Sequence, residues 1–230
     1  MSTDLKNKNF NKKLLFITII LLFLTQIVFS TTIAAEENKQ NSQGKENEEA
    51  VYIDAARLEY QNKKTILTGG IKVRKKDTVI NALKGELIRE EQKMILEEKI
   101  NVEYPDGKVK SKLLTAFLKN EEYIFENKAV LNYTLSDGRK MILNSDYLKI
   151  FGEDNSFIAK KSVKINYDQQ VFKGDKADYD GESEKMKLTG NVKIEEGNDW
   201  IRSESANFNL QEGKEGYTAE GNVEIKMILD

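Results

Sequence analysis

The chain has 230 residues, of which 39% are hydrophobic and 32% charged, and its formal net charge is −2 at pH 7. It contains no cysteine and no histidine. Thiol catalysis, disulfide bonds, Cys/His zinc sites and histidine-dependent catalytic triads are therefore excluded. The near-zero net charge also gives no basic field of the kind that nucleic-acid-binding proteins use.

Residues 1–35 have the layout of a secretory signal peptide. Four lysines precede an apolar run from Leu14 to Phe29, small residues follow, and acidic residues begin at Glu36. Cleavage is expected after Ala34 or Ala35. The alternative is an uncleaved anchor helix, because the uncharged stretch is long enough to span a bilayer. In either case the remainder of the chain is delivered across a membrane.

Residues 36–50 are polar and contain almost no large apolar side chain, which predicts a disordered leader. The folded part is then expected to be a single domain that comprises residues 51–230. Without disulfide bonds, its stability must come from the fold alone.

One pattern recurs six times after residue 50, with a period of about 30 residues. Clear copies are ILTGGIKV (66–73), KLTGNVKI (187–194) and TAEGNVEI (218–225). The aligned aliphatic residues after the central pair are Ile71, Ile100, Val130, Val163, Val192 and Val223. A central Gly-Gly or Gly-Asn pair predicts a sharp bend of a curved sheet or a bulge with positive φ.

Apolar and polar residues alternate with a period of two in each half of a copy, which predicts strands with one buried face. Short polar links between the halves predict hairpins, so six copies give about twelve strands. The stretch 82–100 is rich in helix formers, but its aligned neighbours favour strand–turn–strand. Residues 121–131 and 154–165 are aligned with one extra residue before the valine, which predicts bulges there.

The segment GDKADYDGESEKMKLTGNVKIEEGNDWIRSESANFNL (174–210) resembles the OstA/LptA domain of lipopolysaccharide-transport proteins. That family's pattern is A-D-x-x-x-Y, a short turn, L-x-G-N-V-x-V, and then A-D/N-x-x-x-L. The middle copies, 82–165, depart from it because they lack the Gly-Asn pair. The residues that fit are Ala177, Asp178, Leu188, Gly190, Asn191, Val192, Ile194, Ala206, Asn207 and Leu210, and more loosely Ala56, Leu58, Tyr60, Leu67, Gly69 and Ile71.

The resemblance implies an all-β fold, an elongated, V-shaped antiparallel β-jellyroll with an apolar groove. It also implies a periplasmic carrier that shields the acyl chains of lipopolysaccharide, whose exposure to water costs about 0.8 kcal/mol per CH₂. The groove candidates are the inward aliphatic residues Ile71, Val73, Ile100, Val102, Leu188, Val192, Ile194, Val223 and Ile225. The same residues could equally form a closed core.

Basic residues near strand ends are the candidates for contacts with lipid phosphates. They are Lys72, Arg74, Lys75, Lys76, Lys160 and Lys161. Lysines on strands also serve as solvated faces or as protection of a sheet edge, so this assignment competes with a structural one.

The implied partners are lipopolysaccharide or a similar acylated glycolipid, an inner-membrane Lpt export complex and an outer-membrane LptD-type insertion protein. Head-to-tail self-association is expected through the first strand, about 51–60, and the last, 221–230, because unpaired edges can pair with another chain. The alternatives are a membrane-anchored, LptC-like transfer component and a structural β-repeat scaffold without lipid.

An enzyme is not expected. The sequence has no G-x-S-x-G elbow and no histidine base, and the acids of DKADYDGESE (175–184) do not follow the calcium-loop spacing. No cofactor and no metal ion are implied.

Overall fold

The computed structural model describes residues 50–229, and all their regular elements are β-strands. The predicted signal peptide (1–35) and nearly all of the predicted leader (36–50) lie outside the described residues. Within 50–229, no helix has the length and apolar character needed to cross a membrane. The strands are β1 (Tyr52–Gln61), β2 (Lys64–Lys75), β3 (Thr78–Ile88), β4 (Lys93–Tyr104), β5 (Gly107–Phe117), β6 (Glu122–Thr134), β7 (Lys140–Phe151), β8 (Phe157–Tyr167), β9 (Gln170–Asp180), β10 (Lys185–Glu196), β11 (Asp199–Asn209), β12 (Gly216–Glu220) and β13 (Glu224–Lys226).

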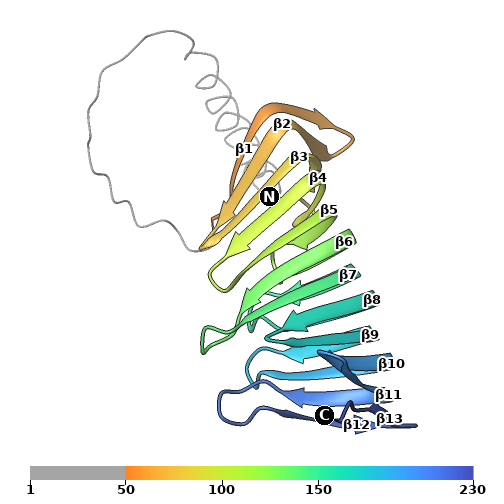
Figure 1. Ribbon diagram of the computed structural model, residues 1–230. Coiled ribbons are helices and arrows are strands. Elements are labelled where there is room, and N and C mark those ends of the chain that lie inside the picture. The colour runs from red at the N-terminus through yellow and green to blue at the C-terminus, as the bar shows by residue number, and fades with distance from the viewer. Residues whose placement is uncertain (1–49, 230) are drawn as a thin grey trace, which may run out of the picture. The chain divides into compact units, whose positions relative to one another are not determined.

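The strands form one antiparallel sheet in which each strand pairs with its neighbours in sequence, from β1 at one end to β12 at the other (Figure 1). β12 and β13 both pair with β11, β12 along 205–209 and β13 along 200–202. They are two pieces of one broken strand, so the prediction of about twelve strands from six hairpins is confirmed. The stretch 82–100 is strand, turn and strand, as expected.

β2, β4, β6, β8 and β10 are each bent sharply by two consecutive residues with positive φ, here called the crease pair, and a sixth crease pair separates β12 from β13. The pairing register shifts at each of these positions. The crease pairs are Gly69-Gly70, Glu98-Lys99, Asn127-Lys128, Lys161-Ser162, Gly190-Asn191 and Gly221-Asn222. In β2 and β10 the central Gly-Gly or Gly-Asn is therefore both a bend and a bulge, because two left-handed residues in succession turn the chain without ending the strand.

The alignment of the third copy was wrong by one residue. The crease pair Asn127-Lys128 is followed by Ala129, which is buried, whereas the aligned Val130 lies on the half-buried outer side. Bulges do occur within 121–131 and 154–165, as predicted, but neither segment has an extra residue. The same bulge is present in every copy.

Odd-numbered strands bend opposite the crease pairs and have a small residue there. Ser111, Ser145 and Ser203 each donate a hydrogen bond from Oγ to the carbonyl oxygen two residues later, over 2.9, 3.0 and 2.9 Å. Ala82 and Gly174 hold the equivalent positions in β3 and β9. A small residue is required because the two bent chains approach closely at this line.

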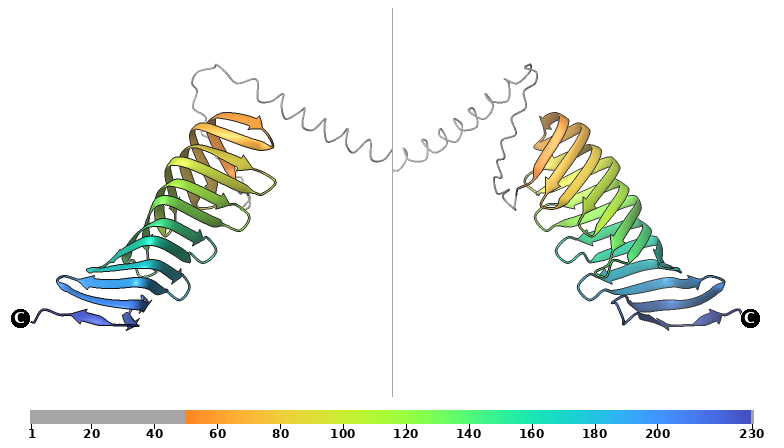
Figure 2. Two further views of the ribbon diagram at one scale, coloured as in Figure 1. Left: turned by 90° about the vertical axis from the view of Figure 1, so that its right-hand side faces the viewer. Right: turned by 60° about the vertical axis from the view of Figure 1, so that its left-hand side comes forward.

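The creases divide the sheet into two halves that fold over each other (Figure 2). Arm A contains the residues of each even-numbered strand that precede its crease, such as 65–68 of β2. It also contains the residues of each odd-numbered strand that follow its bend, such as 84–87 of β3. Arm B contains the other parts, such as 71–75 and 78–82. Because side chains alternate across a strand, every second residue of both arms points into the space between them.

Candidate functional site

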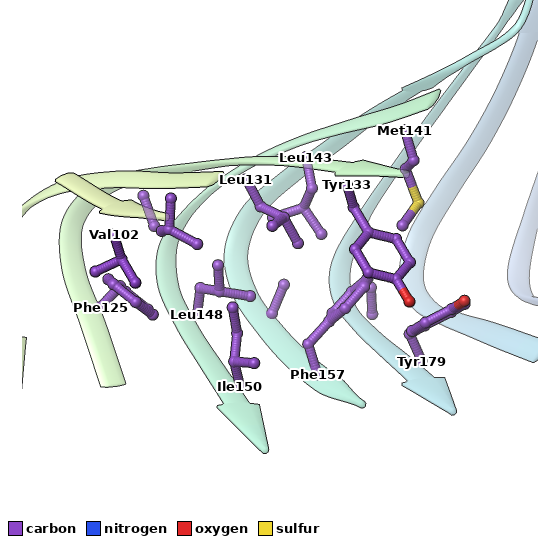
Figure 3. Packing of buried hydrophobic residues seen from close by; sticks show 14 of the residues in the cluster. Val102, Phe125, Leu131, Tyr133, Met141, Leu143, Leu148, Ile150, Phe157 and Tyr179 are labelled. Atoms are coloured by element: carbon purple, nitrogen blue, oxygen red, sulfur yellow. The ribbon is translucent and has the colours of Figure 1, made fainter. Parts of the chain in front are cut away.

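The interior between the arms is a continuous band of apolar side chains that extends along most of the sheet. Figure 3 shows its middle part, where Leu131, Leu143 and Met141 of arm B face Leu148 and Phe157 of arm A. All five side chains are at most 1% exposed. The interior is thus apolar on both walls and closed to water along this part.

The structure brings most of the predicted groove residues together in this interior. Seven of them are no more than 3% exposed, namely Ile71, Val73, Ile100, Val102, Leu188, Val192 and Ile194. The remaining two are Val223, which directly precedes β13, and Ile225, which lies in β13, and they are 46% and 59% exposed. These two side chains lack a following strand to cover them.

Both ends of the stack expose apolar residues that would be interior in a longer sheet. At the first strand, Leu58 pairs with the buried Leu67 but is itself 62% exposed, and Tyr60 is similarly open. At the other end, Ile225 and Met227 are exposed. The apolar band therefore reaches solvent at each end of the sheet.

A mouth lies along the side opposite the creases, between the turns that end arm A and those that end arm B. Among residues 50–229, hydrogen bonds and ion pairs between turns cross it at four places. Lys75 donates to the carbonyl oxygen of Leu118 over 2.7 Å. Lys75 and Lys76 both form ion pairs with Glu121, over 3.0 and 2.9 Å. Asn155 Nδ2 donates to Asp106 Oδ2 over 3.0 Å.

The other two crossings lie nearer the C-terminal end. The buried carboxylate of Glu184 accepts a hydrogen bond from the amide of Ser136 over 2.9 Å. Arg139 donates to the carbonyl oxygen of Leu210 (2.7 Å) and pairs with Glu215 (2.9 Å). These four contacts, here called rungs, hold the arms together in the present conformation.

A cavity of about 640 Å³ opens in the mouth near the N-terminal end of the sheet. This volume lies within the range of small-molecule sites. Its lining residues are Val51, Lys75, Lys76, Leu87, Arg89, Gln92, Leu118, Lys119 and Glu121. The cavity thus combines four basic side chains and one carboxylate with an apolar part.

A second cavity of about 220 Å³ lies between the first two rungs and reaches the buried Val102 and Phe125. Hydrogen bonds from Lys76 and Lys75 hold the pKa of the Glu121 carboxyl below its usual range. Burial raises the pKa of Tyr123 to about 12 and also raises that of Tyr104. Both phenols line this cavity.

The predicted phosphate contacts are not gathered into one place. Lys72 and Arg74 lie on the outer face of β2, where Arg74 pairs with Asp54 over 3.1 Å. Lys160 and Lys161 lie at the crease of β8, which is separated from β2 by five intervening strands of the sheet. Lys75 and Lys76 lie together in the lining of the 640 Å³ cavity.

Sequence reasoning missed Arg89 and Lys119, because they belong to turns that approach Lys75 only after the sheet bends. It also missed the small residues opposite the creases. A signal for those was present, since Ser111, Ser145, Gly174 and Ser203 recur at nearly the repeat period.

The fold and the interior define a β-jellyroll of repeated, bent hairpins around an apolar band. The family model described as "LptA/(LptD N-terminal domain) LPS transport protein" matches residues 51–214. The chain therefore belongs to this family of lipopolysaccharide-transport proteins, which confirms the resemblance seen in the repeats. The family and the fold are those of transport proteins rather than of enzymes.

Among solved structures, the chain is similar to LptH of Pseudomonas aeruginosa, described as the LptA homologous periplasmic component of the conserved lipopolysaccharide transport device. The identity is 10% and the TM-score 0.40, and the match covers 79% of this chain and 97% of that one. No curated protein matches significantly.

Proposed function

We propose that the protein carries lipopolysaccharide, or a similar acylated glycolipid, with its acyl chains between the two arms. The observation that supports this is the continuous apolar interior, which reaches solvent at both ends of the sheet, in a chain of the lipopolysaccharide-transport family. Each acyl CH₂ transferred from water into such an interior gains about 0.8 kcal/mol.

In this proposal the arms separate to admit the lipid. Without lipid, the interior is filled by the protein's own side chains. The two walls then meet through apolar contacts, which acyl chains can replace. The rungs are polar contacts between turns. The ion pairs of Lys76 and Arg139 are partly exposed, so these pairs contribute little to stability. Opening the mouth therefore breaks few strong interactions.

The exposed ends suggest how lipid passes between proteins. A partner sheet that continues the stack at β1 or at β12 and β13 would cover Leu58 or Ile225 and extend the apolar band. Another copy of this chain, an inner-membrane export complex or an outer-membrane LptD-type protein could fill this role. Such end-to-end pairing would form a bridge between inner and outer membranes.

The location that fits this role is the periplasm, with residues 1–35 removed as a signal peptide and 36–50 as a leader to the domain 51–230. In the alternative, the N-terminal segment stays in the membrane and the protein is an anchored, LptC-like component. The first residue of protein recovered from cells distinguishes the two. A start at Ala35 or Glu36 indicates the carrier, and an intact Met1 indicates the anchor.

A photo-crosslinking experiment tests the lipid site directly. A benzoylphenylalanine placed at Phe157, which is 1% exposed in the interior, should crosslink to added lipopolysaccharide. The same group at Tyr147, on the outer face of β7, should not. Equal labelling at both positions, or labelling at Tyr147 alone, would contradict an interior site. Mass spectrometry can also detect glycolipid that stays bound to the purified protein. If it finds none, the scaffold alternative is favoured.

A further inference from the structure

The cavity near the N-terminal end has an excess of positive charge that the side chains of residues 50–229 do not neutralise. Within residues 50–229, the side chains of Arg89 and Lys119 make no ion pair or hydrogen bond. The acids next to Arg89 are engaged elsewhere, since Glu90 pairs with Lys63 over 3.6 Å and Glu91 with Lys93 over 2.9 Å. Two basic side chains are thus available to a ligand at this cavity.

Glu121 is the one carboxylate of the lining, and it forms the first rung. It accepts from both Lys75 and Lys76 at 3.0 and 2.9 Å. An anion that enters the cavity meets the same two lysines. A phosphate monoester carries about −1.5 to −2 charges near neutral pH and presents three acceptor oxygens, against a single charge and two oxygens for Glu121. It can therefore compete for them.

The apolar part of the lining indicates what the anion is attached to. Val51, Leu87 and Leu118 border the cavity, and each packs against the main apolar core. A free phosphate ion would leave this surface unused. A phosphorylated amphiphile would place its charge on the basic residues and the start of its chain on the apolar ones.

We propose that this cavity binds the phosphate group of an acylated amphiphile, which displaces Glu121 from Lys75 and Lys76 and so releases the first rung. The proposal rests on the proposed function and adds to it a place of entry. Phosphate binding and mouth opening are then coupled, because the same two lysines cannot hold both anions fully. The tail enters where the arms have just been released.

Calorimetric titration of the 36–230 protein with three probes tests the proposal. The probes are dodecyl phosphate and dodecyl maltoside, both below their micelle concentrations, and inorganic phosphate. The wild type should bind dodecyl phosphate about tenfold more tightly than the maltoside, since charge-assisted hydrogen bonds are the stronger ones. Inorganic phosphate should bind more weakly than dodecyl phosphate, because it lacks the apolar part.

Three variants make the test specific. The double variant Arg89→Gln/Lys119→Gln should lose the preference for phosphate and keep its affinity for the maltoside. The control Lys72→Gln/Lys110→Gln removes the same charge from exposed outer positions without ion pairs and should keep the preference. Glu121→Gln removes the competing carboxylate and should bind dodecyl phosphate more tightly. Circular dichroism verifies that each variant is folded.

Each other outcome overturns the proposal in a recognisable way. Equal affinity for the two dodecyl probes, or the same loss in the control, removes the phosphate site and leaves the lipid interior intact. Weaker binding by Glu121→Gln refutes the competition with Glu121. Binding of inorganic phosphate as tightly as dodecyl phosphate assigns the site to the free ion. Failure of both dodecyl probes to bind refutes the proposed function as well.

Discussion

At the scale of single residues, two valines at equivalent places in the repeat have opposite exposure. Val192 and Val223 each follow a Gly-Asn crease pair, but Val192 is 1% exposed and Val223 is 46% exposed. We expect Val192→Asp to destabilise the protein by about 3–5 kcal/mol, because it leaves a buried, unpaired charge. Val223→Asp should stay folded. Thermal unfolding followed by circular dichroism measures both, and similar melting temperatures would contradict the closed interior.

At the scale of the strand, the Gly-Asn pair has a local explanation. In β10, Gly190 and Asn191 both have positive φ, and Asn191 Nδ2 donates to Asp175 Oδ2 over 2.8 Å. A Cβ at Gly190 would lie 2.4 Å from that same oxygen. The pair therefore suits both the bend and the neighbouring strand, which explains its recurrence at Gly221-Asn222, where Asn222 donates to Glu204.

The creases of β4, β6 and β8 lack a Gly-Asn pair, so introducing one there should increase stability. In β8, Lys161 and Ser162 have φ of 66° and 55°, a conformation that costs residues other than glycine about 1–2 kcal/mol. Asp146 on β7 holds the place opposite the β8 crease that Asp175 on β9 holds opposite the β10 crease. We expect Lys161→Gly/Ser162→Asn to stabilise the protein by about 1 kcal/mol, after the larger unfolded-state entropy of glycine is subtracted.

Chemical denaturation measures this change, and the reverse exchange in β10, Gly190→Lys/Asn191→Ser, is its control. The reverse exchange should destabilise by a similar or larger amount, because it adds strain and removes a hydrogen bond. If the β8 variant loses stability, the bend is not relieved by the Gly-Asn pair, and the recurrence needs another explanation.

At the scale of the whole sheet, the first rung should respond to acid. The pKa of Glu121 is below its usual 4.5 in the folded protein, so its ion pairs stabilise the closed mouth above that value. This stabilisation is lost as the pH falls through the lowered pKa. Spin labels at Asp77→Cys and Asn120→Cys, in turns on opposite sides of the mouth, should show a wider distance distribution below pH 4 than at pH 7. A Glu121→Gln variant should show the wide distribution at both values.

The absence of cysteine makes such label pairs unique in this chain. Distances that stay the same down to pH 3 while the protein remains folded would mean that the other rungs and the apolar walls hold the arms without Glu121. The mouth would then open by another route.

Association through the ends of the sheet is a second property of the whole molecule. Removal of residues 226–230 takes away the exposed Met227 and Leu229 and shortens the edge formed by β13. We expect the mass of the wild type, measured by light scattering, to increase with protein concentration, and that of the shortened protein to stay monomeric. A wild type that remains monomeric at high concentration, with and without lipid, would contradict self-assembly.

The sequence by itself determined the local structure of this protein. Period-two alternation and the recurring crease pair specified strands, hairpins and their number, because these depend on neighbouring residues. Even 82–100 was predicted as strand–turn–strand against its helix-forming composition, since the repeat outweighs propensity. The one error of register, Val130 instead of Ala129, arose where both residues are apolar and the crease pair Asn127-Lys128 contains no glycine.

Only the tertiary structure decided how the two arms meet. The alternation predicted that Ile71 and Val192 point inward. It could not show that the facing arm covers both side chains, because this coverage depends on the bend angle at every crease. The rungs join residues far apart in sequence, such as Lys75 with Glu121. Arg89 and Lys119 look like ordinary turn residues until the bent sheet brings them to one cavity, because charge clustering between distant turns has no sequence period.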